Sequence, residues 1–310
     1  MVASHGGRYA RQRSAVLDPQ ANPRTGDDDA VPLPRAHEPD IALVDAGDGR
    51  RLDRFGSRVV DRPAPSAMWP AKLTPEAWAV ADLRFERGEG WIGEETTAWN
   101  ITIEGLTLEL RAAESGQVGF FPEQMASWPW LRSGLAGRTD PGVLHLFAHT
   151  GATTLALAAA GARVTHVDAS RPAVAWARRN ADLSGLTGAP VRWIVDDAVG
   201  FAQREARRGR QYDGFVLDPP SFGHGPRGTR WELADALPDL LDACAAMATD
   251  DAFVLLTAHT TGLDAEDLGD ALVDAFDPPP GMDVATDWLE LRATSGAVLP
   301  LGVVARMIHR

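Results

Sequence analysis

Three aspartates follow short apolar segments of this sequence, and carboxylates placed in this way bind and orient ligands. Asp168, Asp197 and Asp218 each stand at or just after the end of a run rich in aliphatic residues. Such runs suit buried parallel strands. The carboxyl ends of parallel strands meet at one edge of an open α/β sheet, where ligands bind. We therefore expect the three carboxylates to converge on one ligand.

The segment before the first of these acids has the pattern of a strand, a tight loop and a helix. Residues 143–147 are apolar, a loop reading His-Thr-Gly follows, and the small residues of 151–160 suit a helix packed closely on a sheet. A second strand at 163–167, rich in β-branched residues, leads to Asp168. The acid follows Gly151 by 17 residues. That spacing is close to the roughly 20 residues expected of a carboxylate that accepts hydrogen bonds from ribose hydroxyls.

The loop carries one glycine, which indicates an adenosyl ligand without phosphates. A dinucleotide needs the pattern G-x-G-x-x-G so that its pyrophosphate can approach bare backbone. This loop lacks the other glycines, which disfavours a dehydrogenase. S-Adenosylmethionine, which has a carboxylate and no phosphate, fits better, while an ordinary βαβ turn is the alternative interpretation. The residues expected to contact this cofactor here are Phe147, His149, Thr150, Gly151, Asp168 and Ala169.

Two further acids, Asp196 and Asp197, follow the strand expected at 191–195. We expect Asp197, with the adjacent Ala198, to contact the cofactor by accepting a hydrogen bond from the adenine amino group, because Asp197 directly precedes a helix. An aspartate in this position also commonly caps the helix by accepting from its first backbone N–H groups. Both roles can hold at once.

Residues 215–222 read Phe-Val-Leu-Asp-Pro-Pro-Ser-Phe and are the most specific signal in the chain. The two prolines make the loop rigid and extended, since each fixes its own φ and restricts the residue before it. We expect Asp218 and Pro219 to form a catalytic loop in which Asp218 also contacts the cofactor. The oxygens of this loop are expected to accept hydrogen bonds from a base edge. Phe222 is expected to stack on an extruded base. A Pro-Pro turn with a capping aspartate is the alternative interpretation.

Strands and helices alternate regularly after Gly142, which predicts a mostly parallel, doubly wound α/β sheet. The expected strands lie at 143–147, 163–167, 191–195, 212–217, 252–257, 286–292 and 299–306, and the expected helices at 151–160, 171–184, 197–208, 233–248 and 264–275. The last two strands, linked across 293–296, read as a hairpin at one edge of the sheet.

The chain is expected to divide into three parts. Residues 1–39 are rich in Arg, Asp, Pro and Ala without apolar periodicity, which indicates a disordered tail. Residues 40–120 are expected to form a small β-rich domain, and residues 121–310 the α/β domain. The α/β domain begins with a helix at about 123–135, which has Pro122 at its first turn.

Within the small β-rich domain, turn signals separate short apolar runs. A first hairpin is expected between 41–44 and 58–60, with its turn at 47–49. A short helix is expected at 75–83. A second hairpin is expected within 99–110, where apolar residues alternate on both sides of a glycine.

Composition indicates a globular protein of a reducing compartment. The chain has 310 residues, of which 45% are hydrophobic and one is a cysteine, so a full core is expected and a disulfide framework is not. No apolar run reaches the roughly 18 residues of a membrane span. Residues 1–15 lack the apolar centre of a secretory signal. We therefore expect a cytoplasmic protein that does not bind membranes.

The charge balance limits the kinds of partner. A net charge of −13 counts against holding nucleic acid through bulk electrostatics. Arginines cluster within 204–210 and at Arg227 and Arg230, where they form either solvated helix faces or a local RNA-binding surface. The histidines are scattered without the spacing of metal ligands, so no metal site is expected.

Several segments together resemble the bacterial methyltransferases that act on large-subunit ribosomal RNA, a family that includes 5-methylcytosine enzymes and relatives that methylate guanine at N7. The matching segments are 144–151 (Leu-His-Leu-Phe-Ala-His-Thr-Gly), 167–170 (Val-Asp-Ala-Ser), 177–180 with 183–186 (Ala-Arg-Arg-Asn and Leu-Ser-Gly-Leu) and 217–222 (Leu-Asp-Pro-Pro-Ser-Phe). The resemblance covers about residues 100–310. It implies a class I, Rossmann-like methyltransferase domain with a seven-stranded sheet, S-adenosylmethionine as cofactor and ribosomal RNA as partner.

The sequence departs from that family in two places near the N-terminal side. Residues 120–124, Phe-Phe-Pro-Glu-Gln, are similar to the segment that leads into the family's methyltransferase domain, whose pattern is Leu-Asp-Gln-Arg or Leu-Asp-His-Arg. The resemblance implies that Gln124 approaches the cofactor, but Glu123 and Met125 replace the family's Asp and Arg. The family's RNA-binding PUA module would lie ahead of the small β domain, where only the expected tail is found.

The third departure concerns the catalytic cysteine. Methylation of carbon 5 of a pyrimidine requires a thiolate that attacks carbon 6. In the family that thiol follows the strand after the Asp-Pro-Pro motif, and here residues 256–262 read Leu-Thr-Ala-His-Thr-Thr-Gly. The single cysteine, Cys244, shares a helical spacing with Leu240 and Leu241, which predicts a core position. We therefore expect direct in-line transfer of the methyl group to a nitrogen or oxygen.

Three functions remain open from the sequence. The first is a methyltransferase acting on a nucleobase of ribosomal RNA, with His224 and His259 either as general bases or as plain loop residues. The second keeps the cofactor but has a small molecule or protein as acceptor, which the acidic charge favours. The third is an inactive relative that binds the cofactor.

Overall fold

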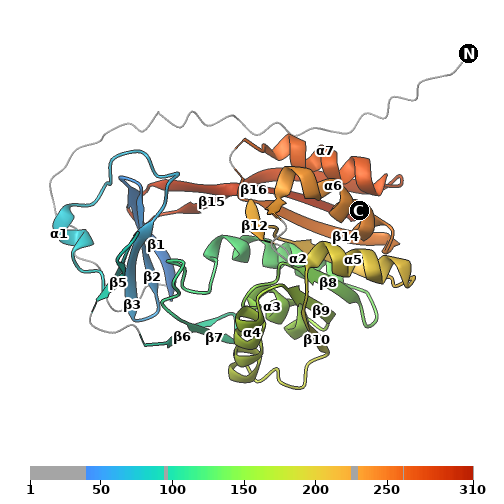
Figure 1. Cartoon of the computed structure of the whole chain (residues 1–310), viewed down its shortest axis with the longest axis horizontal. Helices are drawn as coiled ribbons and strands as arrows, with labels where there is room; N and C mark the ends of the chain where they lie inside the picture. Colours follow the sequence, from blue (N-terminus) through green and yellow to red (C-terminus); the bar gives the residue numbers. More distant parts are fainter. Residues whose placement is uncertain (1–39, 94–96, 225–229, 261, 310) are drawn as a thin grey trace, which may run out of the picture.

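The structure, a computed structural model, describes residues 40–93, 97–224, 230–260 and 262–309. A five-stranded sheet and a seven-stranded sheet stand apart, and the last two strands of the chain run between them (Figure 1). The tail expected at 1–39 lies outside the described residues. None of the helices in the described ranges combines the length and apolar character of a membrane span.

The seven-stranded sheet confirms the predicted fold class. Its strands lie in the order β10-β9-β8-β11-β14-β16-β15. They are β8 (Gly142–Leu146), β9 (Arg163–Asp168), β10 (Val191–Val195), β11 (Tyr212–Leu217), β14 (Ala248–Ala258), β15 (Met282–Arg292) and β16 (Val298–His309). The first five are parallel, and β16 runs antiparallel to β14 and β15. The edge hairpin is therefore present, with strands longer than the apolar runs alone predicted.

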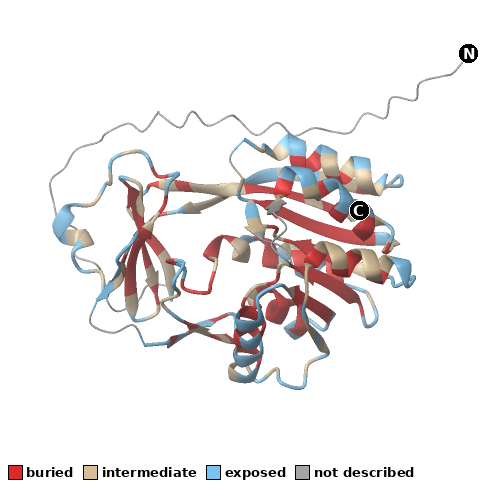
Figure 2. Ribbon diagram, viewed as in Figure 1, coloured by how far each residue is buried: buried red, intermediate tan, exposed pale blue. Residues whose placement is uncertain are grey.

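Helices connect these strands at the expected places. They are α3 (Ala152–Ala159), α4 (Arg171–Leu183), α5 (Ala198–Arg207), α6 (Leu233–Ala245) and α7 (Ala265–Phe276). The central strands β8 and β11 are almost wholly buried (Figure 2), which explains their continuous apolar runs, whereas the edge strand β10 is partly exposed. A short two-stranded sheet, β12 (Phe222–His224) with β13 (Arg230–Glu232), was not predicted.

The helix expected at 123–135 forms in two pieces. A 3-10 helix, η1 (Pro122–Ser127), precedes α2 (Trp128–Leu135). Pro129 has no N–H to continue the hydrogen bonds of the first piece, so the helix restarts there. The break leaves Gln124 on the tighter piece.

The N-terminal sheet has more strands than predicted. It comprises β1 (Ile41–Gly47), β2 (Arg50–Phe55), β3 (Arg58–Pro63), β4 (Leu83–Glu86) and β5 (Gly90–Gly93), in that order. The expected single hairpin between 41–44 and 58–60 is wrong, because β2 lies between these two segments and pairs with both. The helix at 75–83 is also shorter, since α1 (Pro75–Trp78) is one turn.

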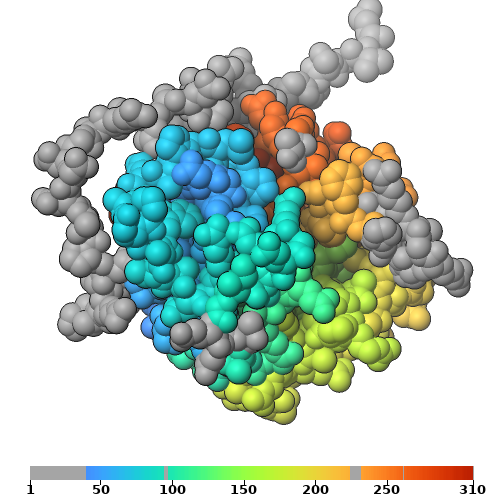
Figure 3. Space-filling view, turned by 60° about the vertical axis from the view of Figure 1, so that its left-hand side comes forward, coloured from blue at the N-terminus to red at the C-terminus, as the bar shows by residue number. Residues whose placement is uncertain are grey.

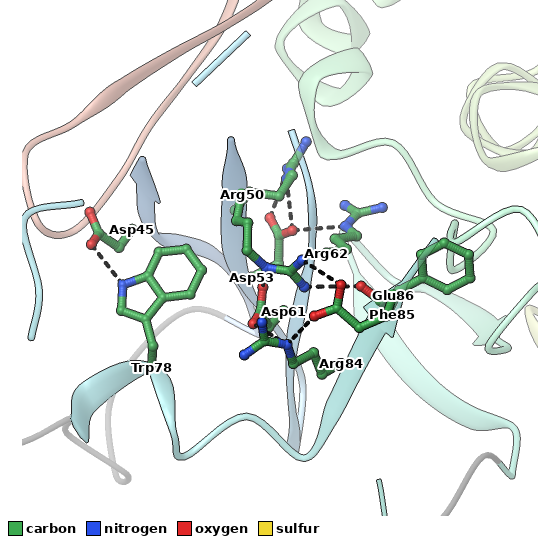
Figure 4. Close-up of polar contacts among 10 residues, drawn as sticks. Asp45, Arg50, Asp53, Asp61, Arg62, Trp78, Arg84, Phe85 and Glu86 are labelled. Atoms are coloured by element: carbon green, nitrogen blue, oxygen red, sulfur yellow. Dashed lines mark hydrogen bonds and ion pairs between the residues drawn. The ribbon is translucent and has the colours of Figure 1, made fainter. Parts of the chain in front are cut away.

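Buried charged residues explain why β2 was not predicted from an apolar sequence pattern. Arg51 and Asp53 point to the same face of β2, and Arg51 lies opposite Arg62 of β3. Arg51 donates two hydrogen bonds of 2.7 Å to the Asp53 carboxylate, and Arg62 Nε donates a third of 2.9 Å. Burial alone would raise the pKa of Asp53, but the two guanidinium groups outweigh it and hold the pKa below its usual value. Figure 4 shows this cluster beside the ion pairs of Asp61.

The hairpin of β6 (Trp99–Ile103) and β7 (Leu106–Leu110) forms as predicted. Its apolar residues are buried alternately. β7 packs on α4, where Asn180 Oδ1 accepts from the backbone of Glu109 at 2.9 Å. The division near residue 120 stays a prediction, since this hairpin shares one apolar core with β8 and α3.

The hairpin of β15 and β16 reaches from the large sheet to the small one (Figure 1). At its tip, Thr294 N donates to Leu43 O at 2.9 Å, and Ser295 Oγ donates to Asp45 Oδ1 at 2.6 Å. Apolar residues around this tip form a separate small core. The first and last described strands are therefore held together.

Candidate functional site

A pocket lies at the carboxyl ends of β8 and β11, where the sequence placed its ligand. Six of the predicted site residues line it: Gln124, Phe147, His149, Thr150, Gly151 and Asp218. They come from η1, the loop after β8 and the end of β11. In the space-filling view, green residues are recessed between the teal N-terminal segments and the yellow-to-orange segments (Figure 3). The structure thus brings the loop after β8 and the Asp218 loop together.

The backbone of the loop after β8 is unusual. Phe147 has φ 57° and His149 has φ 47°, and Gly151 follows with φ 83°. Positive φ is uncommon for residues other than glycine, and such strain concentrates at functional sites. Gly151 is also required by space, because a Cβ there would lie 2.9 Å from Ala177 Cβ. A single glycine suffices because two bulky residues adopt the left-handed conformation beside it.

Asp168 holds this loop in shape. Its Oδ2 accepts from His149 N at 2.8 Å, and its Oδ1 accepts from Ser170 N at 2.8 Å. A carboxylate has about four lone-pair sites, so Asp168 can still accept from a ribose hydroxyl as predicted. Ala169 follows Asp168 directly and, like it, does not line the enclosed pocket.

Replacing Asp168 by Ala is expected to weaken binding of S-adenosylmethionine by about 1–3 kcal/mol, because a buried hydrogen bond is lost and the loop loses its anchor. Isothermal titration calorimetry measures the effect directly. Asp182→Ala is the matched control, since that acid lies on α4 and bonds Thr187 at 2.9 Å. Equal affinities of the two variants would contradict the role of Asp168.

Of the two acids after β10, Asp197 caps a helix, which was the alternative that the sequence left open. Asp197 Oδ2 accepts from Gly200 N at 2.7 Å and so caps α5. Asp196 pairs with Arg204 instead. Neither Asp197 nor Ala198 lines the enclosed pocket, so their contact with an adenine stays a prediction.

Asp218 is held by two side chains from β14 and the residues after it. Thr257 Oγ1 and His259 Nε2, the latter at 3.1 Å, both bond Asp218 Oδ1. Among the described residues, neither Thr257 nor His259 bonds Oδ2. This oxygen can therefore accept a hydrogen bond from the substrate that receives the methyl group. Burial alone would raise the pKa of Asp218, but His259 and Thr257 outweigh it and lower the pKa below its usual value. The carboxylate is ionised at neutral pH.

The remaining predicted residues follow Asp218 in the sequence. Pro219 is adjacent to it, and Phe222 opens β12 with 61% of its surface exposed. Single exposed apolar side chains are normal on protein surfaces, so stacking of this ring on an acceptor stays a prediction.

The pocket also contains residues that the sequence analysis missed. They are Gly119, Phe120, Phe121, Trp128, His145, Ala148, Ala152, Thr153 and Val216. The Phe121 ring lies 5.3 Å from the His149 ring, edge to face. Trp128 Nε1 donates to Thr153 Oγ1 at 3.1 Å. Only their closeness in sequence to Gln124 and to the motifs could have indicated a place in the site. Aromatic residues at such positions otherwise predict a hydrophobic core.

Comparison with known proteins identifies the family of this chain. The chain matches the family described as S-adenosylmethionine-dependent methyltransferases over residues 64–246. It belongs to this family. The methyltransferase is 35% identical to a SAM-dependent methyltransferase from Agrobacterium tumefaciens, with a TM-score of 0.83 over 88% of this chain and 91% of that one.

Two further known proteins resemble this methyltransferase, one in sequence and one in fold. The Ribosomal RNA large subunit methyltransferase I of Klebsiella pneumoniae (strain 342) is 30% identical over 183 residues, which are 56% of this chain and 44% of that protein. The chain thus matches less than half the length of this relative. SMU.776, described as a methyltransferase complexed with SAH, has a TM-score of 0.69 at 15% identity over 87% of this chain and 76% of its own. That likeness concerns the fold alone.

Polar groups in the pocket of the methyltransferase fit its cofactor. His149 Nδ1 and Gln124 Nε2 are buried and make no hydrogen bond to any described residue. Burial lowers the pKa of His149, so its ring is neutral at neutral pH. Buried polar atoms are normally hydrogen-bonded, so these two call for a ligand that offers polar atoms, as S-adenosylmethionine does.

The segment before η1 forms one wall of the pocket. Thr150 Oγ1 donates to Gly119 O, and the Phe121 ring packs edge to face on the His149 ring. The segment before η1 and the loop after β8 are therefore in direct contact.

Proposed function

We propose that this methyltransferase modifies a nucleobase of ribosomal RNA by direct transfer, without a covalent cysteine intermediate. The name of the Klebsiella pneumoniae relative supports this substrate. The exposed Phe222 beside Asp218 supports a flat acceptor. A ribosomal RNA substrate implies a cytoplasmic enzyme.

The observation that carries the direct mechanism is the position of the cysteine. Cys244, the single cysteine of the chain, is fully buried in α6, and burial raises the pKa of its thiol. A buried thiol with a raised pKa is a poor nucleophile. The residues beside Asp218 that lie nearest the family's cysteine position are Thr257 and His259. The thiolate attack that carbon-5 methylation needs has no candidate at this site.

One set of residues binds the cofactor and another binds the acceptor. S-Adenosylmethionine supplies a methyl group bound to a positively charged sulfur. We propose that the chain holds it with Gln124, Phe147, His149, Thr150, Gly151, Asp168, Ala169, Asp197 and Ala198. On the acceptor side, Asp218 Oδ2 accepts a hydrogen bond from the base edge, Pro219 keeps the loop extended, and Phe222 stacks on the base. Fixing the acceptor against the methyl group supplies most of the rate.

Replacing Phe222 by Ala is expected to raise KM for the RNA by about 5- to 150-fold, since stacking on one base contributes about 1–3 kcal/mol. The thermal stability and the cofactor affinity should stay at their wild-type values, because the ring is mostly exposed. Trp288→Ala is the matched control, an exposed aromatic residue on β15. A similar KM in both variants would show that Phe222 does not bind the acceptor.

A small molecule or protein is the second candidate acceptor, and the net charge of −13 favours it. Transfer of tritiated methyl groups distinguishes the two. Labelling of ribosomal RNA from a strain lacking this gene, followed by mass mapping of the modified nucleoside, supports the first candidate. Labelling of protein or small-molecule fractions alone supports the second. Tight cofactor binding without labelling of any cellular fraction indicates an inactive relative.

A further inference from the structure

His259 occupies an unusual position for a histidine next to a catalytic carboxylate. Its Nδ1 lies 2.6 Å from Leu301 O of β16, and its Nε2 lies 3.1 Å from Asp218 Oδ1. Both neighbours are acceptors, and a carbonyl oxygen has no proton to give. The ring must therefore donate from Nδ1 to Leu301 O.

The second nitrogen must donate as well. If Nε2 were unprotonated, Asp218 would have to carry the proton between the two groups. An imidazole is a stronger base than a carboxylate, and Asp218 Oδ1 already accepts from Thr257. The proton therefore belongs on His259, which makes the ring an imidazolium.

We propose that His259 is a fixed imidazolium that positions Asp218 as an ionised hydrogen-bond acceptor facing the substrate. This inference rests on the proposed methyl transfer at Asp218, and it goes beyond it by naming the residue that fixes the charge and orientation of the catalytic carboxylate. His259 is here a positioning residue and not the general base that the sequence left open.

The surroundings of His259 keep it charged. The His259 side chain is 30% exposed. Its partial burial would lower the pKa of His259, but Asp218, the Leu301 carbonyl and the nearby Glu123 of η1 raise it to about 9. His145 of β8, which lines the same pocket as Asp218, has its pKa lowered to about 4 by burial. It adds no competing positive charge at neutral pH. His259 is thus the cation that balances Asp218.

The charge state of His259 can be measured without any substrate. In histidine-labelled protein, an NMR titration is expected to show one ring with a pKa of about 9, absent from the spectrum of His259→Gln. In Asp218→Asn this pKa should fall by at least about one unit, since the charge that raises it is gone. Ser221→Ala is the matched control, because Ser221 bonds Thr260 and not His259. A His259 pKa near 6.5, or one that Asp218→Asn leaves unchanged, would overturn the proposal.

The pH dependence of transfer tests the positioning role. The wild-type kcat should be level between about pH 6 and 8 and fall above about 9, because the raised pKa keeps His259 charged only below that value. His259→Gln should lower kcat by about 10- to 100-fold and lose the alkaline fall, with unchanged cofactor affinity. An alkaline fall that persists in His259→Gln would contradict the assignment.

The titration separates this inference from the proposed substrate, because it needs no RNA. If no RNA is labelled while the titration still gives a charged His259, the proposed RNA substrate is wrong and the inference on His259 is unaffected.

Discussion

Replacing Asp218 by Asn is expected to lower kcat by at least about 100-fold, which is the usual cost of removing one electrostatic group aimed at the reacting atoms. Asparagine keeps the shape of the side chain but loses the negative charge that faces the acceptor. The dissociation constant of S-adenosylmethionine should change by less than about threefold, because the loop after β8 supplies most of the predicted cofactor contacts. Single-turnover kinetics measure the first quantity, and calorimetry measures the second.

Asp213 provides the control for this variant. It lies at the other end of β11, where its Oδ2 accepts from Gly142 N at 2.7 Å. Asp213→Asn should therefore keep kcat within about twofold of the wild type, since it is remote from the acceptor. A wild-type kcat in Asp218→Asn would show that Asp218 has no catalytic role.

Replacing Asp53 by Ala is expected to lower the free energy of unfolding by about 3–5 kcal/mol, because two guanidinium groups are left buried without their shared partner. The side chains of Arg51 and Arg62 are only 7% and 4% exposed. Urea denaturation followed by tryptophan fluorescence measures the change, and the N-terminal sheet should unfold first. If the alanine variant does not fold, Asp53→Asn replaces it in the same measurement.

Two further variants make this result specific to burial. Glu104→Ala removes a pair of 2.6 Å with Arg132 whose side chains are about 40% exposed, and it should cost less than about 1 kcal/mol. A triple variant with apolar residues at positions 51, 53 and 62 should be more stable than Asp53→Ala, since the three buried charges of the cluster are removed together. Equal destabilisation by Asp53→Ala and Glu104→Ala would show that the cluster is not buried in solution.

The large sheet was predictable because its signals are local. Strands such as β8 are buried on both faces, so their sequences are continuous apolar runs, and helices between them carry small or amphipathic patterns. β2 was missed for the opposite reason. Its buried face contains Arg51 and Asp53, and charged residues read as a loop unless their partner on β3 is known.

The site was predictable only in part. Gly151 and Asp218 stand in motifs, and both line the pocket. Thr257 and His259 follow Asp218 by 39 and 41 residues, and only the pairing of β11 with β14 brings them to it. The sequence therefore placed His259 near the acceptor but left its role open. The left-handed Phe147 and His149 had no signal, because residues other than glycine rarely mark such positions.

The contact between the tip of the β15–β16 hairpin and β1 bears on how the protein is made. Thr294 Oγ1 donates to Val44 O across a separation of 250 residues. At a synthesis rate of about 5–20 residues per second, the ribosome delivers β1 roughly 12–50 s before its partner. Leu43 and Ala46, which belong to the small core at this contact, stay uncovered during that interval. The nascent N-terminal sheet is therefore a target for chaperones until the final hairpin docks.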